Sequence, residues 1–164
     1  MWDYALRALG RRAHSANQLR SKLSLKAESP ADVTAVMAKL REYGYTDDKK
    51  FSEAFAAARL QNQGFGRFRV LRDLQSKRVS STVASSAVSQ VFQDTNEALL
   101  IEEFLARKYR SVDLREFLQQ EKNVASAYRR LRTAGFSSSL SLAALKRHGQ
   151  RSEDWEEPAE NESP

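Results

Sequence analysis

Apolar residues at helical spacing run along almost the whole chain of 164 residues, and this periodicity limits the fold more than any other feature of the sequence. Val33, Val36, Met37 and Leu40 form one such apolar face, and similar faces recur as far as residue 148. Sustained alternation of β-branched residues is absent, and glycine and proline are few. The pattern predicts an all-α protein with about nine short helices.

A helix stop is predicted near the start of the segment EYGYTDDKKFSEAF, residues 42–55. If Leu40 lies in the last turn of a helix, Gly44 falls where a left-handed backbone suits glycine, and Tyr45 packs back on Leu40. We therefore expect a Schellman motif at this position.

The next helix is expected to begin directly after this stop. Thr46 is the candidate N-cap, and Asp47 and Asp48 then fall in the first turn, where carboxylates complement the positive end of the helix dipole. We interpret the segment as a structural joint formed by Leu40, Gly44, Tyr45, Asp47, Asp48 and Phe51.

The stop recurs and indicates an internal repeat. Leu23, Leu74 and Leu131 align as equivalent positions, separated by 51 and 57 residues. Two further triplets share the spacing of the first stop: Leu74, Arg78 and Val79, in which Arg replaces Gly, and Leu131, Gly135 and Phe136. We predict an elongated, curved body of three tandem three-helix, helix-turn-helix-like repeats, over residues 1–46, 47–94 and 95–149.

Charge is distributed unevenly along the chain. Residues 1–150 hold 26 of the 27 Lys and Arg but 15 of the 21 acids, a net charge of +11, whereas residues 151–164 carry a net charge of −5. A body this basic attracts polyanions or acidic protein surfaces at long range. The acidic end, residues 150–164, is predicted to be a disordered tail because it has few apolar residues and a high charge density.

The sequence lacks the patterns that common catalytic and cofactor sites require. Cysteine is absent, and GFGRFR at 64–69 has Arg69 where a dinucleotide-binding loop needs its third glycine. The sequence contains no P-loop, G-x-S-x-G or H-E-x-x-H pattern. His14 and His148 have no neighbouring ligand pattern and are expected to be exposed, as are the carboxylates at 102–103. We therefore expect no enzymatic activity, no cofactor and no metal.

Clusters of Lys and Arg remain as candidates for function. A single cluster is most simply a solvated helix face, but several fall on the second helices of the predicted repeats and would form a basic strip. Phe65 and Phe68 interleave with these cations, and we interpret them as anchors of a linker rather than platforms for base stacking. The candidate residues for binding a polyanionic partner are Arg11, Arg12, Arg20, Lys22, Lys26, Arg67, Arg69, Arg72, Lys77, Arg78, Arg129, Arg130, Arg132, Lys146 and Arg147.

Three segments resemble, in order, the RecX regulatory proteins of bacteria: ALRALGRRAHSANQLRSKL, LREYGYTDDKKFSEAFAAAR and QGFGRFRVLRDLQSK. The resemblance covers residues 3–148, with the middle segment the most specific and the third repeat the weakest. It implies three three-helix repeats without enzymatic activity that lodge in the groove of the RecA filament on DNA. It also implies that the protein modulates, usually by inhibition, the ATPase, strand-exchange and co-protease activities of RecA, and thereby DNA repair, recombination and the SOS response.

The sequence departs from the expected stop in two repeats. Ala27 and Arg78 stand where glycine is expected after the second helix. A left-handed Arg costs about 1 kcal/mol relative to Gly. Either these helices end differently or the cost is tolerated.

Two other functional classes remain open. One is a free-standing helix-turn-helix DNA-binding protein, although the cations are spread over all three repeats rather than on one recognition helix. The other is a helical adaptor for an acidic protein. No run of 18 apolar residues and no signal-peptide pattern occurs, so we expect a cytoplasmic protein without membrane contact. We expect a monomer, and the resemblance to the RecX proteins implies the RecA filament and single- or double-stranded DNA as its partners.

Overall fold

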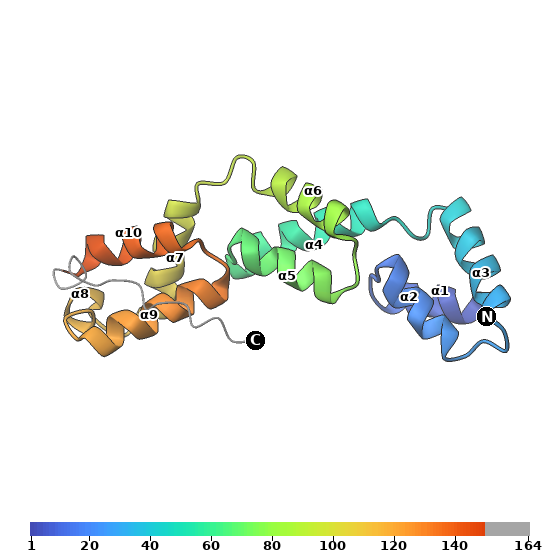
Figure 1. The fold of residues 1–164 in the computed structure, drawn as a ribbon, viewed down its shortest axis with the longest axis horizontal. Coiled ribbons are helices and arrows are strands. Elements are labelled where there is room, and N and C mark those ends of the chain that lie inside the picture. Colours follow the sequence, from blue (N-terminus) through green and yellow to red (C-terminus); the bar gives the residue numbers. More distant parts are fainter. Residues whose placement is uncertain (150–164) are drawn as a thin grey trace. The chain divides into compact units, whose positions relative to one another are not determined.

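The computed structural model describes residues 1–149, which form helices and no strand, so the predicted all-α class is confirmed (Figure 1). The predicted acidic tail lies outside the described residues. The chain divides into two compact units, residues 1–95 and residues from 96 onward. Within the described part the helices are α1 (Trp2–Arg11), α2 (Ala16–Ser24), α3 (Pro30–Glu42), α4 (Asp48–Gln63), α5 (Arg67–Ser76), α6 (Ser81–Val91), α7 (Glu97–Lys108), α8 (Leu114–Phe117), α9 (Glu121–Ala134) and α10 (Ser138–His148).

Helices α1 to α3 enclose one small core in the first unit. Ser15 and Gln18 form a capping box at the start of α2, and Ser29 caps α3 with Pro30 in the first turn. These caps fix where each helix begins and hence which side chains face inward. The buried core consists of Ala5, Leu19, Leu23, Val33, Met37 and Leu40.

Helices α4 to α6 form the second group of the first unit, in which α6 packs on both α4 and α5 (Figure 1). Gly64 ends α4 with a left-handed backbone at φ 60°, and Ser80 caps α6. The side chains buried in this group include Ala56, Val70, Leu74, Ala84, Val88 and Phe92.

The second unit contains four helices in its described part, one more than the three expected. The additional helix, α8, has four residues, and Asp113 caps it by accepting hydrogen bonds from the amides of Arg115 and Glu116. Helix α10 packs on α7 and α9. The buried side chains include Ile101, Phe104, Leu118, Leu131, Phe136 and Leu145.

The helix stop predicted after Leu40 is confirmed. Gly44 has φ 71°, its amide donates to the Arg41 carbonyl at 3.0 Å, and the Tyr45 amide donates to the Leu40 carbonyl at 2.8 Å. These two bonds define the Schellman motif. The Tyr45 ring, however, is 52% exposed and lies edge-on to Trp2, with 6.1 Å between ring centroids.

The same two-bond stop occurs at the other predicted positions. Gly135 has φ 95°, and the Phe136 amide donates to the Leu131 carbonyl at 3.2 Å. Arg78 has φ 61°, and it is the one non-glycine residue with positive φ in the described chain. The Val79 amide donates to the Leu74 carbonyl at 3.3 Å. Helix α2 ends differently, because neither Lys26 nor Ala27 after it takes the left-handed conformation.

The predicted start of α4 was wrong by one residue. Asp47, not Thr46, is the N-cap: its carboxylate accepts hydrogen bonds from the amides of Lys49 and Lys50, both at 3.0 Å. Thr46 is buried instead. A carboxylate is a strong cap because it adds a negative charge at the positive end of the helix dipole.

Asp48 has a role that the sequence did not indicate. Its Oδ1 accepts a hydrogen bond from the Ala16 amide at 2.7 Å, at the start of α2. The first amides of a helix have no partner within the helix, so this carboxylate satisfies one of them from a neighbouring helix group. The segment around Gly44 thus links α3 to α4 along the chain, and through Asp48 it also contacts the start of α2.

Candidate ionic interface

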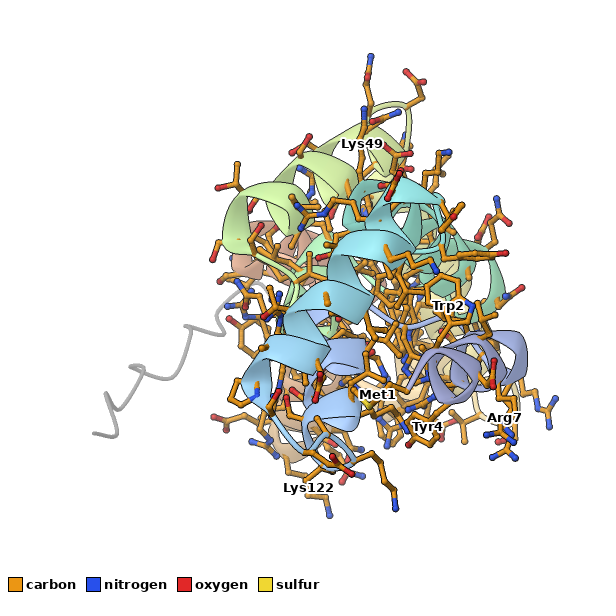
Figure 2. The ribbon with its side chains drawn as sticks, turned by 90° about the vertical axis from the view of Figure 1, so that its right-hand side faces the viewer. Met1, Trp2, Tyr4, Arg7, Lys49 and Lys122 are labelled. Atoms are coloured by element: carbon orange, nitrogen blue, oxygen red, sulfur yellow. The ribbon has the colours of Figure 1, made fainter. Side chains whose placement is uncertain are left out.

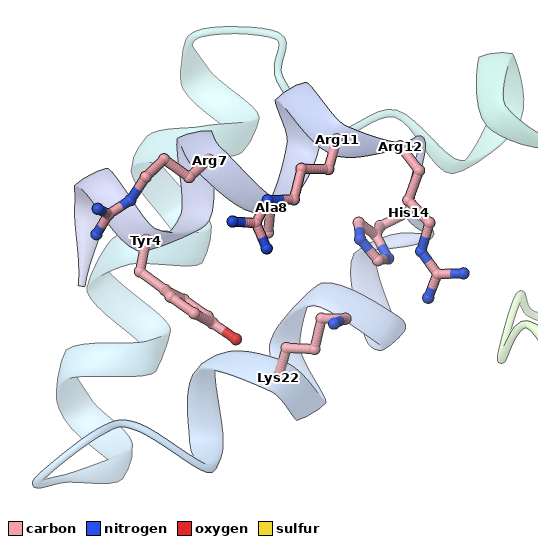
Figure 3. Close-up of a pocket in the computed structure, with 7 residues that line it drawn as sticks. All are labelled: Tyr4, Arg7, Ala8, Arg11, Arg12, His14 and Lys22. Atoms are coloured by element: carbon pink, nitrogen blue, oxygen red, sulfur yellow. The ribbon is translucent and has the colours of Figure 1, made fainter.

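A cavity between α1 and α2 is lined by several cations. It has a volume of about 330 Å³, and its lining contains no carboxylate. Figure 3 shows the Tyr4 hydroxyl, the Lys22 ammonium and the His14 ring turned toward the same space, whereas the Arg7 guanidinium points away from it. The structure brings together three predicted candidates here, and the full lining is Tyr4, Arg7, Ala8, Arg11, Arg12, His14 and Lys22.

His14 is buried, and its predicted exposure was wrong. The residue is 6% exposed, and its Nδ1 atom has no hydrogen-bond partner in the described chain. Burial lowers the pKa of His14, and the nearby charges of Arg12, Lys22 and Lys77 lower it further. The sequence could not show this, because the burial depends on how the turn after α1 folds over α2.

Two candidate cations of the first helix group lie away from this cavity. Arg20 is exposed on α2, where it lines a separate hollow of about 220 Å³ together with Arg41 and Asn17. Lys26 is exposed just after α2. The Lys39 ammonium lies 4.8 Å from the ring centroid of Trp2, at the start of α1. Figure 2 shows Trp2, with Arg7 farther along the same helix.

Two of the candidate cations of α5 make contacts within the fold. Arg69 pairs with Asp73 at 3.0 Å and lies 5.2 Å from the Phe65 ring centroid. Arg67 lies 5.8 Å from the ring centroid of Phe92. Arg72 is exposed. Arginine heads in such contacts hold neighbouring elements together as well as offering charge to a partner.

The two aromatic residues of this linker differ in exposure. Phe65 is half-buried and is contacted by the guanidinium groups of Arg59 and Arg69, which fits the predicted anchor. Phe68 is 53% exposed, so the structure does not place it as an anchor.

Lys77 and Arg78 lie where the two helix groups of the first unit meet. The Ser15 hydroxyl donates to the Lys77 carbonyl at 2.5 Å, and the Asn17 amide donates to the Arg78 carbonyl at 2.9 Å. The Arg78 guanidinium donates to the Ser21 hydroxyl at 2.5 Å. These bonds explain why Arg tolerates a left-handed cap here: the strained residue makes contacts with α2 at both its backbone and its side chain.

The cations of the second unit fall into exposed and engaged groups. Arg129 and Lys146 are exposed. Arg130 lies 5.5 Å from the ring centroid of Tyr109, whose pKa is raised by burial and partly lowered again by that guanidinium. Arg132 donates to the Phe136 carbonyl at 2.8 Å, next to the helix stop.

Glu102, predicted to be a surface charge, is partly exposed and also pairs with two residues at the end of α10. Its carboxylate pairs with Arg147 at 2.9 Å and with the His148 Nε2 atom at 2.5 Å. His148 is therefore half-buried rather than exposed as predicted. Residues 102 and 148 lie on different helices, so no local pattern in the sequence marks the pair.

Residues 1–149 contain no group of three His, Asp or Glu side chains placed to hold a metal ion. None of the helices in this described range combines the length and apolar character needed to cross a bilayer. The arrangement across both units of one continuous basic strip stays a prediction.

The fold and its surface define the class of protein: an all-helical protein with three-helix domains whose prominent surface chemistry is ionic. Family models described as the first and the second three-helix domain of RecX match residues 2–40 and 47–88. Regulatory protein RecX of Vibrio vulnificus (strain CMCP6) is 30% identical over 135 residues, which cover 82% of this chain and 84% of that protein. The chain belongs to the RecX family of regulatory proteins, as the sequence resemblance predicted.

A further relative has a similar sequence, and a solved structure has the same fold. Regulatory protein RecX of Bacillus subtilis (strain 168) is 28% identical over 161 residues, which cover 96% of this chain and 59% of that protein. The crystal structure of RecX from Lactobacillus salivarius shares the fold with a TM-score of 0.71 at 17% identity, covering 89% of this chain and 92% of that one.

Proposed function

We propose that this protein binds the filament that RecA forms on DNA and lowers the activity of RecA. Membership of the RecX family carries the proposal, since the resemblance of the quoted segments implies a RecA regulator rather than an enzyme. The cationic side chains supply the physical basis, because a DNA-containing filament is a polyanion. In the cytoplasm, such binding would restrain strand exchange and co-protease activity, and so affect DNA repair, recombination and the SOS response.

Exposed cations of both units are the proposed contact residues. They include Arg72 on α5 and Arg129 and Lys146 in the second unit, each of them exposed. Engaged cations such as Arg69 contribute charge while also holding the fold together. We propose that the protein acts as a monomer over three three-helix repeats, residues 1–46, 47–94 and 95–149, on one filament.

A titration into RecA assembled on single-stranded DNA tests the function. ATP turnover should fall at near-stoichiometric or lower ratios, and the protein should co-sediment with the filament more strongly than with naked DNA. Unchanged turnover with retained co-sedimentation would remove the inhibitory role. Tight, sequence-dependent binding to naked duplex DNA, without filament binding, would instead favour a free-standing helix-turn-helix protein.

A further inference from the structure

The cavity between α1 and α2 concentrates positive charge that no ion pair within residues 1–149 neutralises. Arg11 comes from the last turn of α1, Arg12 is the cap residue that follows it, and Lys22 comes from α2. None of these three forms an ion pair within the described residues. Like charges held together repel one another, so this arrangement becomes favourable when an anion enters.

Helix stability alone does not account for the cluster. Cations at the end of α1 complement the negative end of its dipole, which explains Arg11. It does not explain Lys22, which approaches the same space from α2. Two helices therefore converge on one position with the same sign of charge.

His14 forms part of the wall of this cavity. It is more than nine-tenths buried, lines the cavity, and has no protein partner for Nδ1. An unsatisfied buried polar atom costs free energy unless a ligand or solvent bonds to it. The Nδ1 atom is itself enclosed by the protein, so His14 reports on the wall of the cavity rather than donating to its contents.

We propose that this cavity binds a phosphate group, supplied either by a nucleic-acid strand or by a free phosphate compound. A phosphate offers several acceptor oxygens in a compact tetrahedron, which suits the forked guanidinium of Arg11 or Arg12 together with the Lys22 ammonium. The Tyr4 hydroxyl supplies one more donor. The volume of about 330 Å³ lies within the range of about 300–1,000 Å³ that is usual for small-molecule sites.

The histidine content of the chain gives a direct assay. His14 and His148 are the two histidines of the sequence, and His148 is held by Glu102 in the other unit. Their imidazole proton resonances can be followed by NMR in the full chain, with the His14→Asn variant used for assignment. Pyrophosphate or a short single-stranded oligonucleotide should shift the His14 resonance in a saturable manner and leave the His148 resonance in place.

Charge-matched variants test the residues. The Arg11→Gln, Lys22→Gln double variant should bind pyrophosphate about tenfold more weakly or worse, since it loses two charge-assisted contacts. The Lys49→Gln, Lys50→Gln double variant removes the same charge from exposed positions on α4 and should change the affinity by less than about threefold.

The phosphate concentration at half-saturation distinguishes the two possible sources of the phosphate. Half-saturation of the His14 shift at lower phosphate concentration with the oligonucleotide assigns the site to a nucleic-acid strand, and the reverse order assigns it to a free phosphate compound. An unmoved His14 resonance with both probes would overturn the proposal, as would equal losses in the two double variants. RecA is absent from these titrations, so their outcome is independent of the filament test.

Discussion

Gly44 and Arg78 take nearly the same left-handed backbone conformation, with φ of 71° and 61°, but with different consequences. Glycine adopts this conformation without strain, whereas an L-residue pays for it by about 1 kcal/mol. Arg78 offsets this cost through its contacts to Asn17 and Ser21 on α2. Gly44 thus suits its helix stop through its backbone freedom, whereas Arg78 suits its stop through its contacts with α2.

Substitution of Gly44 by Val should therefore destabilise the protein by about 1 kcal/mol or more. A Cβ at Gly44 would meet no atom within 4 Å, so the loss would come from the backbone and not from a clash. Gly10→Val is the matched control, since Gly10 also has open space but lies within α1 without a positive φ. Urea unfolding of both variants measures the difference. Equal stability of the two would show that the left-handed conformation carries no cost here.

At the scale of the helices, Asp48 connects the start of α4 to the start of α2. Asp48→Ala should lower the free energy of unfolding by about 1–3 kcal/mol, because the Ala16 amide loses its acceptor. Asp48→Asn keeps a side-chain oxygen in the same place and should lose less. Equilibrium unfolding in urea compares them. If both variants match the wild type, the hydrogen bond across the two helix groups contributes nothing to stability.

The helices and their ends could be predicted because their signals are local. The Schellman stops involve residues within five positions of one another, and the caps at Ser15 and Ser29 involve residues three apart. Helix α8 could not be predicted from periodicity, since four residues cover barely one turn. Bonds such as Asp48 to Ala16 join residues 32 apart and exist only after the helix groups pack.

The candidate site likewise has features that the sequence shows and features that depend on tertiary packing. Clusters of Arg and Lys are visible in the sequence. Three of the candidate cations, Arg11, Arg12 and Lys22, do line the cavity between α1 and α2. Which cations are engaged by partners within the fold is a tertiary property, as Arg69 with Asp73 and Arg147 with Glu102 show. The burial of His14 depends on packing in the same way.

For the whole molecule, the separation of charge along the chain carries a further prediction. Residues 1–150 have a net charge of +11 and residues 151–164 a net charge of −5. Contacts between two segments of one chain are intramolecular, with effective concentrations of about millimolar for short linkers, so even weak ionic contacts compete with an external anion. Truncation after Gly149 should tighten binding to naked DNA at low salt, with the gain shrinking as salt rises.

A full-length variant with the acidic residues of 151–164 replaced by their amides separates charge from length. It should bind naked DNA as the truncated chain does, because the loss of negative charge, not the loss of residues, is the cause. Fluorescence anisotropy over a salt series measures both chains beside the wild type. If all three bind with equal affinity at low salt, the acidic segment does not screen the body. The predicted filament contacts would then act with the full net charge of +11 on residues 1–150.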